Sequence, residues 1–182
     1  MKYSTLKKTE DGSYYSSIRT DDDKPMTIRI NDVRLSDGTI DGDDDTWFTY
    51  SGEGDANGIA IAEECIVKDI KEDPSTWFGK NVREKTIDNS FISNFSQNGE
   101  FQVIRASNLK VFNKETKELI SKESVTGDDV CDILVQLQGI SFFKRNFQIT
   151  LKLHQVQVTP KTEEKKEVCH DDWVMADYGF DE

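Results

Sequence analysis

The sequence predicts a mainly β fold in which five or more strands close into a small barrel, with an inserted helical segment and a disordered tail. Three observations support this prediction. Apolar residues alternate with polar ones in several short segments, which is the period of a half-buried strand. The alternation changes phase inside two of these segments. Beyond residue 160 the periodicity disappears and acidic residues dominate.

The strands are clearest in the second half of the chain. Every second residue is apolar over 131–137 and again over 147–153, and Val156 and Val158 then continue in the opposite phase. The same change of phase separates Ile28 and Ile30 from Val33 and Leu35. It indicates a bulge or bend, the device by which a short sheet curls shut. Further strands are expected at 46–50, 101–104 and 109–111.

The middle of the chain predicts the helical insertion. Asp73 and Pro74 supply a helix cap and a first-turn proline, and Gly79 supplies a stop. Ile87, Phe91 and Phe95 then recur at helical spacing. Among small barrels of this kind the OB fold is the commonest, and it is more often a binding scaffold than a catalyst. We therefore expect an OB-like five-stranded barrel over residues 1–160 and a flexible acidic–aromatic tail over 161–182.

Length and composition limit the class of protein. A chain of 182 residues suits a single domain, and its 18 aromatic residues argue against wholesale disorder. No apolar stretch approaches the roughly 18 residues that a membrane helix needs, and the N-terminus lacks the apolar run of a signal peptide. Three cysteines without a C-x-x-C spacing argue against a disulfide scaffold or a thiolate zinc site. We expect an intracellular protein in a reducing compartment.

The net charge of −12 is unevenly distributed. Residues 1–99 carry a net charge of −8 and residues 161–182 one of −5, whereas residues 100–160 carry +1. No carboxylate occurs from Ile133 to Pro160. Association with a polyanion depends on the local potential, so this segment is a candidate binding surface in an acidic protein. The alternative is a buried β-hairpin without a binding role.

Strand parity selects candidate ligand-binding residues. If Phe147 and its alternate neighbours point inward, Phe142, Lys144 and Lys152 point outward, and the strand near Leu109 likewise exposes lysines around Phe112. Aromatic faces stack on exposed bases and lysines neutralise phosphates, so this pattern is typical of a groove for single-stranded nucleic acid. The predicted DNA-binding residues are Lys110, Phe112, Lys114, Phe142, Lys144, Arg145 and Lys152. In the alternative interpretation, Phe112 and Phe142 lie under the helix as core.

Signals for catalysis or for a cofactor are weak. The two histidines, His154 and His170, have no partner at a spacing that would suit a triad or a metal site. The run Asp41–Asp45 begins like a calcium loop, but Gly52 stands where the closing glutamate is needed. No phosphate-binding glycine motif is present. We expect no enzyme activity, no metal and no cofactor.

The tail combines acid with aromatic rings. Residues 171–182 contain five carboxylates, no cation and three aromatic residues. Negative charge with stacking rings mimics single-stranded nucleic acid, so the tail is expected to compete with DNA and to dock on partner proteins. The alternative is a frayed terminus or a last helix packed on the body. The predicted tail residues are Asp171, Asp172, Trp173, Asp177, Tyr178 and Phe180.

Residues 100–182 resemble the single-stranded DNA-binding protein of T-seven-like phages and its relatives in large DNA viruses. The resemblance rests on 109–113 (LKVFN), 127–130 (GDDV), 134–137 (LVQL), 142–144 (FFK), 147–153 (FQITLKL) and 155–158 (QVQV). It implies an OB fold with an inserted helix, a homodimer and a mobile acidic tail that recruits replication proteins such as a DNA polymerase or helicase. The first 99 residues match only loosely, and here Phe180 is followed by Asp181 and Glu182, where the family's tail tends to end on phenylalanine.

The sequence thus predicts a viral or phage protein that coats single-stranded DNA without sequence specificity during replication, recombination or repair in the infected cell. The alternative is an acidic β-barrel adaptor that binds other proteins and has no DNA binding of its own. The net charge of −12 favours the adaptor, whereas the acid-free segment favours DNA binding.

Overall fold

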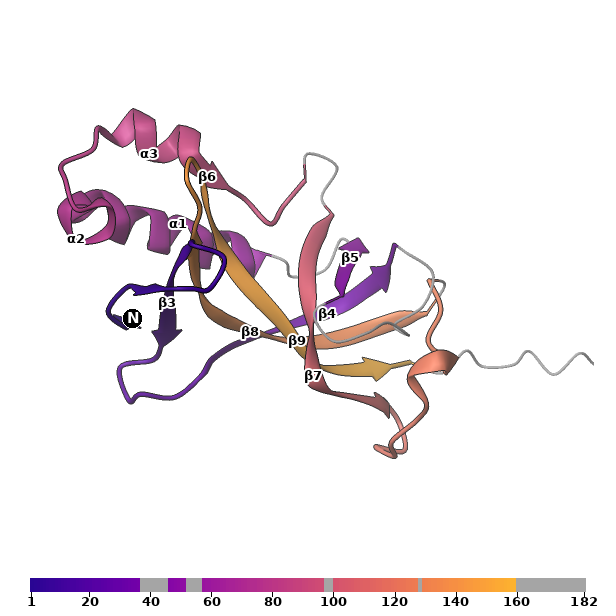
Figure 1. Cartoon of the computed structure of the whole chain (residues 1–182). Helices are drawn as coiled ribbons and strands as arrows, with labels where there is room; N and C mark the ends of the chain where they lie inside the picture. Colours follow the sequence, from indigo (N-terminus) through magenta and orange to yellow (C-terminus); the bar gives the residue numbers. More distant parts are fainter. Residues whose placement is uncertain (37–45, 52–56, 97–99, 128, 160–182) are drawn as a thin grey trace, which may run out of the picture.

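The computed structural model describes residues 1–36, 46–51, 57–96, 100–127 and 129–159 (Figure 1). The described part is mainly β, as predicted. Its strands are β1 (Lys2–Tyr3), β2 (Lys7–Lys8), β3 (Tyr14–Arg19), β4 (Met26–Leu35), β5 (Trp47–Ser51), β6 (Phe91–Ile92), β7 (Phe101–Asn113), β8 (Val130–Phe142) and β9 (Phe147–Val158). Its helices are α1 (Asn57–Glu72), α2 (Pro74–Phe78), α3 (Glu84–Ser90) and the short 3-10 helix η1 (Lys122–Ser124).

Five of the strands form a ring in the order β8–β4–β5–β7–β9 and back to β8. The β7–β9 pair is parallel and the other four pairs are antiparallel. Fully buried apolar side chains from all five strands make the core; they include Ile30, Tyr50, Phe101, Ile133 and Leu151. The predicted inward parity of the 147–153 segment is confirmed, since Phe147, Ile149, Leu151 and Leu153 are all buried.

Both predicted changes of phase are confirmed as bulges. In the β8–β9 ladder, Leu134 pairs with Gln155 and Val135 with Leu153, so His154 is the extra residue. In β4 the pairing with β8 shifts between Ile30 and Val33, where Asp32 adopts a φ of +54°. Each bulge moves the following apolar residues to the inner face, which keeps both long strands buried as they bend.

The helical insertion is larger than predicted from the sequence. Helix α2 begins and ends as expected, capped by Asp73 and closed by Gly79 with a φ of +66°. Helix α1 was missed, although Ile59, Ala62, Ile66 and Ile70 are all buried at helical spacing.

The prediction of a helix through Ile87, Phe91 and Phe95 is wrong beyond Ser90. Phe91 starts β6 and pairs with Phe147, and Phe95 forms a bridge with Phe101. These two rings are therefore held by strand pairing, which overrides their helical spacing.

Three N-terminal strands extend the sheet outside the ring and were not predicted. Strand β3 pairs with β8, and β1 and β2 both pair with β3. Gly139 permits this approach, because a side chain there would clash with the Ser16 carbonyl oxygen and the Tyr15 ring. The hydroxyl of Tyr15 donates to the carbonyl oxygen of Gln138 at 2.8 Å. The N-terminal strands, helices α1, α2 and α3, and the turn of the β8–β9 hairpin gather at one end of the molecule (Figure 1).

The predicted tail (161–182) and the acidic run Asp41–Asp45 lie outside the described residues. Within the described residues, no helix has the length and apolar character needed to cross a membrane.

Candidate nucleic-acid interface

A groove of about 920 Å³ lies where the helical insertion meets the turn of the β8–β9 hairpin. Its walls come from three segments that are far apart in the chain: the start of β3, the stretch from α2 to α3, and the turn Phe143–Asn146. The groove is lined by Leu6, Gly12, Tyr14, Thr76, Trp77, Phe78, Gly79, Lys80, Asn81, Val82, Arg83, Thr86, Ile87, Ser90, Phe142, Phe143, Lys144, Arg145, Asn146 and Phe147.

The charge of this lining has one sign. Lys80 and Arg83 stand on the connection between α2 and α3, and Lys144 and Arg145 stand on the hairpin turn; all four are exposed. The lining contains no aspartate or glutamate. Within the described residues none of these four cations forms an ion pair. Their charge is therefore available to an anionic ligand.

The floor of the groove is a cluster of aromatic rings. Phe142 stacks on Trp77 with ring centroids 5.7 Å apart and on Phe147 at 5.4 Å. Phe78 meets Phe142 edge-on at 5.8 Å. Above this floor, Phe143 and Tyr14 remain about half exposed, at 46% and 47%. The groove therefore offers free aromatic faces beside cations.

Helix α2 positions one wall through its caps. The side chain of Asp73 accepts hydrogen bonds from the backbone N–H and the hydroxyl of Thr76 and from the hydroxyl of Ser75. These bonds hold the pKa of Asp73 below its usual value. At the other end, Gly79 takes the left-handed conformation that turns the chain toward Lys80. Trp77 is thereby packed onto Phe142 while Lys80 faces the solvent.

The prediction that Phe142 lies on an exposed face is wrong. Phe142 is only 6% exposed and belongs to the aromatic floor. The parity was counted straight through the turn, but Phe142 pairs directly with Phe147 across the hairpin. Directly opposite residues share a face, so Phe142 follows Phe147 into the core. Phe143, the next residue, is the exposed ring.

The structure distributes the other predicted DNA-binding residues over three places. Lys144 and Arg145 line the groove, whereas Lys110, Phe112 and Lys152 do not. These three lie on the outward side of the ring, where Lys110 pairs with Gln155, Phe112 with Gln157 and Lys152 with Gln136. Lys110 is exposed, and Phe112 and Lys152 are partly buried. The outward parity predicted for Lys110 and Lys152 is confirmed.

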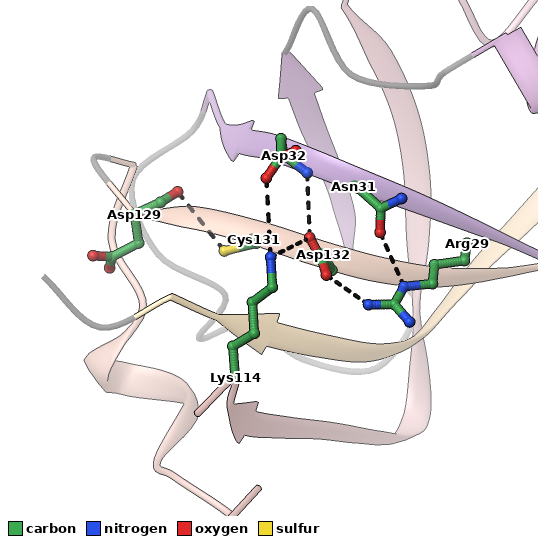
Figure 2. A network of polar contacts seen from close by, with 7 residues as sticks. All are labelled: Arg29, Asn31, Asp32, Lys114, Asp129, Cys131 and Asp132. Carbon is green, nitrogen blue, oxygen red and sulfur yellow. Dashed lines mark hydrogen bonds and ion pairs between the residues drawn. The ribbon is translucent and has the colours of Figure 1, made fainter. Parts of the chain in front are cut away.

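Lys114 belongs to a polar network at the opposite end of the β8–β9 hairpin (Figure 2). Its ammonium group lies 3.1 Å from a carboxylate oxygen of Asp132 and forms a longer ion pair with Asp32. The guanidinium of Arg29 donates to the other oxygen of Asp132 at 2.7 Å. Lys114 is therefore already paired with a protein carboxylate, so its ammonium group is less available to a phosphate.

Asp132 is the centre of this network. Its side chain is only 4% exposed, and its carboxylate accepts a further hydrogen bond from the backbone N–H of Asp32. Burial by itself raises the pKa of Asp132, but the hydrogen bonds from Arg29, Lys114 and the Asp32 backbone outweigh it and leave the pKa lowered. The carboxylate therefore stays ionised and holds both cations.

Among the exposed cations and aromatic rings of the groove, Tyr14, Lys80, Arg83 and Phe143 were not predicted from the sequence. A signal was available, because residues 12–20 and 74–83 contain no carboxylate, like residues 133–160. The fold brings these three acid-free segments together. The tail residues Asp171, Asp172, Trp173, Asp177, Tyr178 and Phe180 lie outside the described residues, so their predicted role stays a prediction.

Residues 31–177 match the model of a protein family described as a family of unknown function, DUF5871. The chain belongs to this family. Strands β1, β2 and β3 precede the matched segment. No curated protein matches the chain.

The fold of the chain is similar to that of solved structures of a phage protein. The single-stranded DNA-binding protein from bacteriophage Enc34 aligns over 91% of this chain and 96% of its own, with a TM-score of 0.50 and 15% sequence identity. The structure of that protein in complex with single-stranded DNA aligns over 87% of this chain and 96% of its own, with a TM-score of 0.47 and 12% identity. At this identity, the first of these alignments is evidence about the fold alone.

Proposed function

We propose that this DUF5871 protein binds single-stranded DNA without sequence specificity and that the groove beside the β8–β9 turn is its binding site. The observation that carries the proposal is the groove's lining of four exposed cations, two half-exposed aromatic rings and no carboxylate. Cations neutralise phosphates and aromatic faces stack on bases of any sequence, so such a groove suits an unpaired strand.

The order of the ring supports the same proposal. The ring has the order β4–β5–β7–β9–β8, and its only parallel pair is β7 with β9. We interpret a ring with this order as an OB fold. In that fold the loop between the last two strands is one of those that contact oligonucleotides, and here this loop is the turn carrying Lys144 and Arg145. The likeness to the phage Enc34 protein is consistent with this interpretation of the fold.

The proposal extends to the protein's biological role. We propose a protein without enzyme activity that coats single strands during replication, recombination or repair in a cell infected by a virus or phage. A homodimeric state, and a tail that competes with DNA and recruits a polymerase or helicase, are further parts of this proposal.

Fluorescence anisotropy with a short labelled oligothymidine tests the binding proposal, with the matching duplex as the comparison. We expect the single strand to bind more tightly, and log K to fall with log salt at a slope of roughly −0.7 per neutralised phosphate. Replacing Lys144 and Arg145 together by glutamine should make that slope shallower by about 1.4.

The matched control is the double replacement of Lys110 and Lys152 by glutamine, which removes the same charge from the outward face of the ring. We expect this control to leave the slope nearly unchanged. If the Lys110 and Lys152 variant is instead the one with the shallower salt slope, the groove is not the binding site. If the unaltered protein does not bind the single strand at low salt, the adaptor that the net charge of −12 favours becomes the better interpretation.

A further inference from the structure

A row of aromatic residues runs across four adjacent strands at the turn end of the hairpin. Phe91 of β6 pairs with Phe147 of β9, Phe147 pairs with Phe142 of β8, and Phe142 pairs with Tyr14 of β3. Paired residues of neighbouring strands share one face of the sheet, so these side chains form a continuous row. On the far side of Tyr14, Lys8 of β2 is its partner in register.

Helix α2 covers only part of this row. Trp77 stacks on Phe142, and Phe78 meets both Phe142 and Phe147 edge-on. Phe142 and Phe147 are accordingly 6% and 0% exposed. Tyr14 lies beyond the reach of this cover and is 47% exposed, although it lines the same groove. The row therefore ends in an uncovered aromatic ring.

The surroundings of Tyr14 distinguish it from an ordinary surface tyrosine. On one side lie the exposed cations of the hairpin turn, Lys144 and Arg145, and on the other side Lys8 is exposed as well. Its hydroxyl has no hydrogen-bond partner within the described residues, and its ring is 47% exposed, so part of the ring remains open to a ligand. An aromatic face between two cationic positions matches a base between two phosphates.

We infer that Tyr14 stacks on a base of the bound strand and that Lys8 contacts a neighbouring phosphate. The inference rests on the proposed function. It assigns the stacking contact with exposed bases to the N-terminal strands, which precede the segment matched by the family model. Because the bases of a duplex already stack on one another, this contact also favours binding of an unpaired strand.

The test compares Tyr14→Leu with Tyr14→Phe on two probes, an oligothymidine and an oligomer of the same length built from abasic sites. Leucine keeps an apolar side chain but loses the ring, whereas phenylalanine keeps the ring. On oligothymidine we expect Tyr14→Leu to bind about fivefold more weakly or worse, and Tyr14→Phe to stay within about twofold of the unaltered protein. On the abasic probe we expect the two variants to bind alike, because that probe offers phosphates and no bases.

The outcomes separate this inference from the proposed function. If the unaltered protein binds neither probe, both proposals fail. If it binds oligothymidine and Tyr14→Leu binds equally well, the proposed function stands and the inference fails. An equal loss on both probes also overturns the inference, because it would mean that the substitution disturbs the groove itself.

Lys8 provides a second, independent measurement. Lys8→Gln should make the salt slope on oligothymidine shallower by about 0.7, the contribution of one phosphate contact. Lys117→Gln is the matched control, because Lys117 is an exposed lysine on the turn after β7, which lies beside Val158 at the opposite end of the β8–β9 hairpin. Equal slopes for Lys8→Gln and the unaltered protein would remove Lys8 from the inferred contact.

Discussion

The two ends of the β8–β9 hairpin carry cations in opposite electrostatic settings. At the open end, Arg29 and Lys114 are both held by the buried carboxylate of Asp132 (Figure 2). At the turn end, Lys144 and Arg145 line a groove that contains no carboxylate. A cation in an acidic protein is therefore available to a polyanion only where no protein carboxylate reaches it. The net charge of −12 does not reveal which cations these are.

The ends also differ in what stabilises them. The open end is held by hydrogen bonds and ion pairs to one buried charge, whereas the turn end is held by stacked aromatic rings. Aromatic packing needs no charge, so the turn end can leave its cations unpaired without a loss of stability. This division of roles can be tested at each end separately.

The largest expected effect on stability comes from the aromatic floor at the turn end. Phe142→Ala removes a ring that stacks on both Trp77 and Phe147, so it should lower the free energy of unfolding by about 3–5 kcal/mol. Phe143→Ala, one residue further, should stay within about 0.5 kcal/mol because that ring is half exposed. Urea denaturation measures both variants.

The two variants should rank the other way round in their affinity for oligothymidine, measured under conditions where both are folded. Phe143→Ala should lose about 1–3 kcal/mol of binding free energy if its ring stacks on a base. If Phe143→Ala destabilises the fold as much as Phe142→Ala does, the distinction between floor and exposed ring is wrong.

The next largest effect is expected at the open end. Replacing Arg29 and Lys114 together by alanine leaves the carboxylate of Asp132 buried without a cation, which should cost about 3 kcal/mol of stability. Adding Asp132→Asn to this double variant should restore much of the loss, because the unpaired charge is then absent. Thermal or urea unfolding of the double and triple variants gives both numbers.

The matched control at the turn end is Lys144→Ala with Arg145→Ala. Both residues are exposed and have no ion pair within the described residues, so this pair should change stability by no more than about 0.5 kcal/mol. A stability loss similar to that of the Arg29 and Lys114 pair would mean that the turn-end cations have structural partners after all.

The sequence predicted those parts of the fold that depend on local pattern. The alternation over 147–153, the two changes of phase and the caps of α2 at Asp73 and Gly79 are all properties of neighbouring residues, and the structure confirms each of them. Helix α1 carried an equally clear pattern of buried isoleucines and could have been predicted in the same way.

The candidate site could be predicted only in part, because its walls meet through tertiary packing. Lys144 and Arg145 were identified from the missing carboxylates around them, but Tyr14 and Lys80 reach the groove only when β3 pairs with β8 and the helices fold over the hairpin. Phe142 was misplaced because parity does not continue through a turn of four residues. Pairing across the hairpin, which no local pattern encodes, decides on which face that ring lies.

The open end should also make the stability of the protein depend on pH. The pKa of Asp132 is lowered in the folded protein, whereas in the unfolded chain an aspartate has a pKa of about 3.9. The unfolded state therefore binds more protons than the folded state as the pH falls. The stability that Asp132 contributes is fully present above pH 4 and is lost as the pH falls through the lowered folded value.

Comparison of the unaltered protein with Asp132→Asn isolates this contribution. Both proteins contain Asp73 and Asp11, whose pKa values are also lowered by hydrogen bonds, so the effects of these groups cancel in the difference. We expect the unaltered protein to be more stable than Asp132→Asn at pH 6, with a difference that narrows as the pH is lowered toward 3. Urea midpoints at several pH values measure it. If the difference in stability between the two proteins stays constant over this pH range, the Asp132 carboxylate is no better stabilised in the fold than in water. Arg29 and Lys114 would then be as available to an anion as the turn-end cations are.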